Sequence, residues 1–175
     1  PGFLFHLIGL YFTYKLTRFW YSEEVALLAV LFTASAFHIM LSDIDVRAEA
    51  FMLGEIIPAC YFWLRYDKHG GLKYLLGGAI FTALAFMTKG LFSLITITSG
   101  IAVLWIYHGR WRNFVSFKWI LALCFSLILT FPELWALYLQ FDLHPEKIIY
   151  GHTHVSGIKW FFWDSQFGRF LGTGP

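Results

Sequence analysis

The sequence predicts an all-α protein: a polytopic bundle of about six transmembrane helices, the first truncated, with an interfacial helix near the C-terminus. Composition, six apolar segments and the placement of charge support this prediction. Hydrophobic residues make up 58% of the 175 residues and charged residues 14%, whereas soluble domains average roughly 45–50% and about 25%. The mean hydropathy of +0.62 also favours a membrane protein over a soluble domain.

Apolar segments separated by short polar connections define the expected helices. They cover residues 3–14, 25–41, 46–64, 74–87, 91–107 and 119–141. Because a membrane helix needs about 20 residues, the first segment is too short to span, and we expect the chain to be a fragment of a longer protein. We expect a transmembrane region over residues 1–141 and an extracytoplasmic loop with the interfacial helix over residues 142–175.

Cations gather in every second connection. The three connections that hold most of them contain Lys15 and Arg18, then Arg65, Lys68 and Lys73, then Arg110, Arg112 and Lys118. If the helices alternate in direction, these connections share one face, which the positive-inside rule makes cytoplasmic, and we expect tryptophans near segment ends, such as Trp63, to lie at the interfaces. The small net charge of +2 and the absence of a basic patch in the sequence argue against nucleic-acid binding.

The most charged stretch, LSDIDVRAEAFMLGE, runs directly into an apolar segment. Asp43 and Asp45 are expected at the N-terminus of a helix, where its dipole favours carboxylates. Residues four apart share a helix face, so Asp43 can form an ion pair with Arg47. Asp45 and Glu49 are also four apart, and we expect this pair of carboxylates to point into the space that the helices enclose. Glu55, almost two turns deeper, is open to two interpretations: an interhelical hydrogen bond or a functional group.

Two cations stand on the face opposite the basic connections. Lys89 occupies a Thr-Lys-Gly turn and Arg169 follows an aromatic WFFW run. Both suit an anion such as a lipid phosphate, with a snorkelling lysine and an interfacial anchor as the alternatives. His152 and His154, two apart in a glycine-flanked loop, are weak candidates for a divalent metal and are otherwise ordinary polar loop residues.

The order of these motifs resembles one family. A helix entered through DVRAE, then ALAFMTKG, then FFW followed five residues later by RF, resembles the GT-C membrane glycosyltransferases that use polyprenyl-phosphate sugars. The similarity is to the bacterial branch related to protein O-mannosyltransferases and the aminoarabinose transferase of lipid A, and it extends from Phe3 to Arg169. It implies a polyprenyl-phosphate-linked sugar donor and a protein or glycolipid acceptor. It also implies a location in the bacterial inner membrane with the site facing the periplasm.

The resemblance assigns roles to individual residues. Asp45 matches the aspartate that opens the corresponding helix, and we expect it to act with Glu49 as the catalytic carboxylates. Lys89 and Arg169 match cations expected to bind the donor phosphate. The family's principal base lies in a first outer loop, which we expect upstream of this sequence, so we expect the fragment itself to be inactive.

Three further residues are expected to give polar support: Asp43, Arg47 and Gln166. Gln166 stands where the aminoarabinose transferase type carries a histidine proposed to bind metal, so the resemblance does not supply a metal ligand there. Two other classes of protein stay open, a secondary transporter with intramembrane carboxylates and a noncatalytic membrane scaffold. Only for the enzyme do we expect Asp45, Lys89 and Arg169 to line one cavity at the outer face.

Overall fold

The computed structural model describes residues 2–44, 47–149 and 152–168, with side chains left out at 42–44. These residues form helices joined by short turns, and no strand occurs among them, which confirms the all-α class. The elements are α1 (Gly2–Trp20), α2 (Glu23–Ala34), α3 (Phe37–Ile44), α4 (Ala48–His69), α5 (Leu72–Lys89), α6 (Leu91–Tyr107), η1 (Trp111–Val115), α7 (Phe117–Leu129), α8 (Phe131–Leu137), η2 (Tyr138–Asp142), α9 (Gly157–Lys159) and η3 (Trp160–Gly168).

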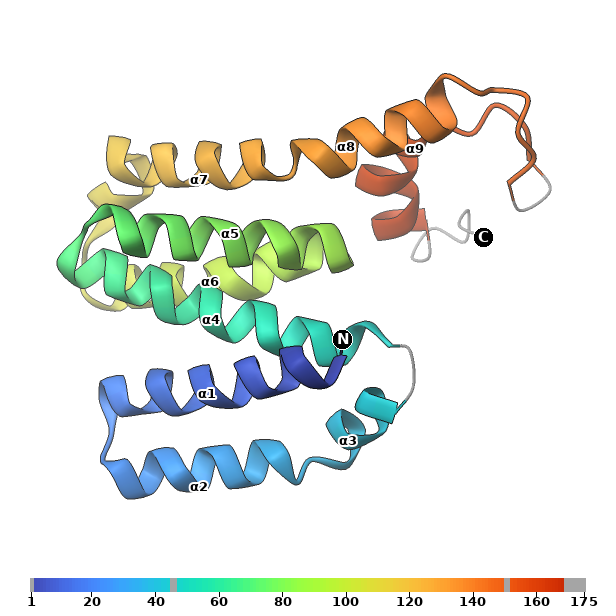
Figure 1. Cartoon of the computed structure of the whole chain (residues 1–175). Coiled ribbons are helices and arrows are strands. Elements are labelled where there is room, and N and C mark those ends of the chain that lie inside the picture. The colour runs from blue at the N-terminus through green and yellow to red at the C-terminus, as the bar shows by residue number, and fades with distance from the viewer. Residues whose placement is uncertain (1, 45–46, 150–151, 169–175) are drawn as a thin grey trace.

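The long helices lie side by side and run in alternating directions (Figure 1). The α1–α2, α4–α5 and α6–α7 connections, which carry most of the basic residues, lie at one end of the bundle, here called the basic end. The first turn of α4, the α5–α6 turn and η3 lie toward the opposite end, here called the Lys89 end. The bundle therefore separates the charges in the way that alternating helices predict.

One described stretch is both long and apolar enough to cross a membrane: Phe117–Asp142, which runs continuously through α7, α8 and η2 with a hydropathy of 2.0. Leu91–Tyr107 is apolar but has only 17 residues. The count of six spans therefore stays a prediction. The helices nevertheless leave large apolar side chains on the outside, as on α2, where Leu31 and Phe32 are exposed. Such faces suit a lipid environment.

The apolar segment expected over residues 25–41 is two helices rather than one. α2 ends at Ala34 and α3 begins at Phe37. Beside the break, the Thr33 hydroxyl donates to the carbonyl of Ala29 and the Ser35 hydroxyl to that of Phe32. Threonine and serine hydroxyls that bond to nearby carbonyls are favoured less in helix interiors than at helix ends, and Thr33 and Ser35 are the polar residues beside this break.

The helix expected from residue 46 begins at Ala48, and Arg47 before it is extended with a φ of −117°. Asp43 belongs to α3, so Asp43 and Arg47 do not share one helix, and their pairing stays a prediction. The shared face predicted for Asp45 and Glu49 stays a prediction. Asp45 itself lies outside the described residues.

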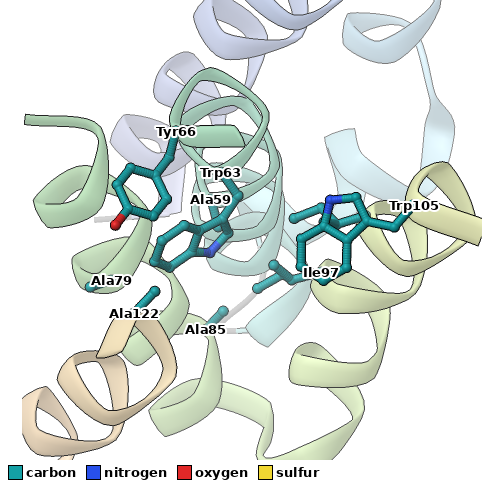
Figure 2. Close-up of a cluster of buried hydrophobic side chains, with 9 residues drawn as sticks. Ala59, Trp63, Tyr66, Ala79, Ala85, Ile97, Trp105 and Ala122 are labelled. Carbon is teal, nitrogen blue, oxygen red and sulfur yellow. The ribbon is translucent and has the colours of Figure 1, made fainter. Parts of the chain in front are cut away.

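The main core lies toward the basic end, where α4, α5, α6 and α7 meet (Figure 2). Trp63 is only 5% exposed and donates from Nε1 to the Thr82 hydroxyl at 2.8 Å. Trp63 was expected at the membrane interface, but the structure places it inside this core. The small residues Ala59 and Ala79 belong to the same buried cluster.

Glycine allows α1 and α4 to approach closely. A Cβ added at Gly54 would collide with the backbone of Phe5, which cannot move aside as a flexible side chain would. We therefore expect Gly54→Val to destabilise the protein by about 1–3 kcal/mol through overpacking, measured as a lower melting temperature in a fixed detergent. Gly100→Ala is the control, since nothing lies within 4 Å of a Cβ there. Equal melting temperatures for the two variants would contradict this account of the α1–α4 contact.

Candidate active site

The predicted Thr-Lys-Gly turn is present, and it joins α5 to α6. Gly90 adopts a φ of 71°, a conformation that glycine reaches without steric cost. Its backbone N–H donates to the carbonyl of Phe86 at 2.7 Å, and its carbonyl accepts from the Ser93 hydroxyl at 2.7 Å. These bonds end α5 at Lys89 and begin α6 at Leu91.

Lys89 and Glu49 meet at the Lys89 end. Glu49 lies in the first turn of α4 and Lys89 in the last turn of α5, so each charge suits the helix terminus that carries it. The Lys89 Nζ lies 3.4 Å from the Glu49 Oε1, and the two side chains are 45% and 53% exposed. An ion pair this open contributes about 0–1 kcal/mol. It can therefore be displaced readily by a more highly charged anion.

Glu55 forms an interhelical hydrogen bond, one of the two interpretations left open by the sequence. Its Oε1 accepts from the Thr88 hydroxyl at 3.0 Å, and the residue is only 2% exposed. Thr88 directly precedes Lys89, so this bond ties the end of α5 to α4. Glu55 and Glu49, both on α4, thereby contact two consecutive residues of α5, Thr88 and Lys89.

The helix formed by α9 and η3 packs against the other side of the turn. Gln166 accepts from the backbone N–H of Leu91 at 3.1 Å, which caps the start of α6. A Cβ at Gly90 would collide with the Gln166 amide, which would then have to move away from the turn. The rings of Phe161 and Phe162 also contact Phe86, with centroids 5.3 and 6.0 Å apart.

Asp142 fixes this helix to the end of η2. Its carboxylate accepts from the hydroxyl of Ser156 and from the backbone N–H groups of Gly157 and Ile158, the latter two at 3.0 and 3.4 Å. These N–H groups belong to the first turn of the helix, where a carboxylate is favoured. The bonds close the base of the intervening loop and hold Gln166 against the α5–α6 turn.

The structure brings Glu49, Lys89 and Gln166 together at one end of the bundle. Asp45 and Arg169 lie outside the described residues, as does the side chain of Asp43, so the predicted cavity shared by Asp45, Lys89 and Arg169 stays a prediction. Arg47 precedes α4 at its N-cap. Sequence reasoning did not single out Thr88 or Asp142, although the position of Thr88 beside Lys89 was a signal available in the sequence.

The loop with His152 and His154 forms no metal centre among the described residues. In that part of the chain, no three His, Cys, Asp or Glu side chains are grouped to hold an ion. His152 pairs through its backbone with Ile149. The ring of His144 lies 3.1 Å from the carboxylate of Glu146, and a backbone hydrogen bond together with this ring lowers the pKa of Glu146. His152 and His154 are therefore not proposed as metal ligands.

The described residues form an all-helical bundle with apolar side chains on its outer faces and an exposed acid–cation pair at one end, which is typical of a membrane protein. Residues 1–135 match the family described as dolichyl-phosphate-mannose-protein mannosyltransferase. The chain belongs to this family of integral-membrane glycosyltransferases of the GT-C type. The match includes Glu49, Glu55 and Lys89 and ends before η3. No curated protein and no solved structure shows a significant match to the chain.

Proposed function

We propose that the chain forms the donor side of an enzyme that transfers a sugar from a polyprenyl phosphate to a protein or glycolipid acceptor. One observation carries the proposal: the Lys89 ammonium and the Glu49 carboxylate lie 3.4 Å apart at one end of the bundle, in a chain that belongs to a glycosyltransferase family. Transfer from a lipid phosphate needs a cation for the leaving phosphate and a carboxylate for the acceptor proton. Lys89 and Glu49 supply these two groups.

The reaction can be written with these residues in separate roles. An acceptor hydroxyl attacks the anomeric carbon while one carboxylate, Glu49 or Asp45, accepts its proton. The bond between that carbon and the phosphate oxygen breaks, and its electron pair goes to the phosphate. Lys89 and Arg169 stabilise the charge that develops there. The roles of Asp45 and Arg169 rest on the family resemblance alone.

The proposed site faces the extracytoplasmic side, which is the periplasm if the protein lies in a bacterial inner membrane. The support is the separation of charge: the basic connections lie at the opposite end of the bundle (Figure 1). In this arrangement the six proposed spans are α1; α2 followed by α3; α4; α5; α6; and α7 followed by α8 and η2. The helix formed by α9 and η3 lies at the outer interface.

Family membership favours the enzyme over the two alternatives. A secondary transporter places its ionisable groups near the midplane on broken helices, whereas Glu49 and Lys89 lie at helix ends. A scaffold would give its outer charges no common target. In the described residues, Glu49 and Lys89 instead face each other.

Glu49 also has a proposed role before the donor binds. With the site empty, its carboxylate pairs with Lys89, and the pair is weak enough for a phosphate to displace it. Displacement frees the carboxylate to act on the acceptor. Binding of the donor and release of the base are thereby coupled.

We expect Glu49→Gln to separate these two effects. Without the competing carboxylate, affinity for a polyprenyl phosphate should rise up to about fivefold, corresponding to about 1 kcal/mol. Transfer should fall by up to about 100-fold, because Glu49 is one of the carboxylates proposed to accept the acceptor proton, while the principal base that the family resemblance implies is a different residue. Binding and single-turnover transfer would be measured on the intact protein, with Glu146→Gln as a control carboxylate paired to His144. Weaker donor binding in Glu49→Gln would contradict the competition.

The experiment that tests the proposed function is transfer of labelled mannose from a polyprenyl phosphate in membranes containing the intact protein. Mannose is the first donor to test because the family description names it. Acceptor peptides and glycolipids would be offered in separate reactions. Transfer that requires Lys89 supports the proposal, whereas no transfer to either acceptor class from any of several polyprenyl-phosphate sugars would refute it.

A further inference from the structure

We propose that Glu55 and Thr88 form a positioning pair that sets the location of the Lys89 ammonium relative to Glu49. This inference rests on the proposed function, in which Lys89 binds the donor phosphate. Neither residue touches the phosphate. Both act through the end of α5.

The geometry connects Glu55 to Lys89 by one hydrogen bond and one peptide unit. The Glu55 Oε1 accepts from the Thr88 hydroxyl at 3.0 Å, and Lys89 is the next residue. Glu49 and Glu55 both belong to α4. Helix α4 therefore carries both carboxylates: Glu49, which faces Lys89, and Glu55, which holds the α5–α6 turn.

Stability alone does not account for Glu55. Ionisable groups within membrane helices are costly to bury. The Glu55 Oε2 is also fully buried and has no hydrogen-bond partner in the described part of the chain, which adds a desolvation penalty. A well-packed apolar residue would serve packing better at such a position. The hydrogen bond between Glu55 and Thr88, which holds the α5–α6 turn, accounts for an acid at this buried position.

The α5–α6 turn is fixed on two sides. Gln166 holds its α6 side through the backbone N–H of Leu91. Glu55 holds its α5 side through Thr88. Without the Glu55 bond, the last turn of α5 would keep only the solvent-open Lys89–Glu49 pair as a polar contact to α4, and the long lysine side chain would sample a wider range of positions. Preorganisation of a cation is worth affinity because less freedom is lost on binding.

The chain offers a matched control for this bond. The Trp63 Nε1 donates to the Thr82 hydroxyl at 2.8 Å, which also joins α4 to α5 through a buried threonine. Thr82 lies closer to the basic end, away from Lys89. Thr82→Val and Thr88→Val each remove one α4–α5 hydrogen bond with nearly the same change of side chain.

We expect Thr88→Val to weaken binding of a short-chain polyprenyl phosphate to the intact protein about tenfold, and Thr88→Ser to restore it. Thr82→Val should leave this affinity unchanged, although both valine variants lower the melting temperature. A purely structural role would move the melting temperatures without separating the affinities. Equal affinities in Thr88→Val and Thr82→Val would overturn the inference.

Substitutions of Glu55 provide a second test if Thr88→Val does not fold. Glu55→Gln keeps an oxygen that accepts from Thr88 and should bind the lipid phosphate nearly as the parent protein does, while Glu55→Leu should bind about tenfold more weakly. Equal loss in both would overturn action through the hydrogen bond. Lys89→Ala distinguishes failure of the proposed function from failure of the positioning role. If Lys89→Ala binds the lipid phosphate as the parent protein does, the proposed function is refuted. Weakened binding in Lys89→Ala beside unchanged Thr88→Val refutes only the positioning role.

Discussion

Lys89→Ala is expected to weaken binding of a polyprenyl phosphate by about 10–100-fold. The estimate follows from roughly 1.5–3 kcal/mol for a hydrogen bond to a charged group and about 1.4 kcal/mol for each factor of ten. Thermal stability should change little, because the Lys89–Glu49 pair is open to solvent. Affinity would be measured by titrating the intact protein in detergent with the lipid phosphate.

Lys73→Ala is the matched control for this variant. Lys73 lies in the first turn of the same helix, at the basic end, with its Nζ 4.8 Å from the centroid of the Tyr74 ring. It should therefore leave affinity for the lipid phosphate unchanged. Equal weakening in both variants would indicate a general effect of lowering the positive charge, and it would contradict a phosphate site at Lys89.

Asp67→Ala is expected to cause the largest loss of stability. The Asp67 side chain is 7% exposed and accepts from Arg110 Nη1 at 2.7 Å and Trp105 Nε1 at 3.1 Å. Breaking a fully buried pair costs about 3–5 kcal/mol. We expect about 2–4 kcal/mol here because the Arg110 side chain is 39% exposed. The measurement is the melting temperature in a fixed detergent.

The control for Asp67 is a conservative replacement. Asp67→Asn keeps an oxygen that can accept from Trp105 but loses the charge that pairs with Arg110, so its melting temperature should fall by less. Donor affinity should be unaffected in both variants, since Asp67 lies at the basic end. A melting temperature for Asp67→Ala within one degree or so of the parent's would contradict a stabilising network at that end.

The sequence predicted the helical class and the placement of charges because these depend on composition and on local apolar runs. The Thr-Lys-Gly turn was predicted for the same reason, since glycine next to a polar pair is a local signal. The break between α2 and α3 was missed because residues 25–41 were treated as one apolar segment, although the polar residues Thr33 and Ser35 interrupt it. The late start of α4 was missed because the four-residue spacing of charges resembled a helix face.

The long-range contacts of the site could not be predicted from local patterns. Gln166 reaches Leu91 across 75 residues of sequence, and Asp142 caps a helix that starts fifteen residues later. Trp63 was assigned to the interface from its place near the end of a segment, but packing between four helices decides its burial. Glu55 was recognised as unusual, yet only the structure identifies Thr88 as its partner.

The most direct test of a donor-phosphate site at Lys89 is photo-crosslinking in the native membrane. A polyprenyl phosphate with a photoreactive group beside its phosphate would be activated, and the labelled peptides would be mapped by mass spectrometry. We expect adducts at residues 88–91 and in the first turn of α4. These adducts should disappear with excess unlabelled lipid phosphate and in Lys89→Ala. Adducts confined to the basic end, or unaffected by either treatment, would contradict a donor-phosphate site at Lys89.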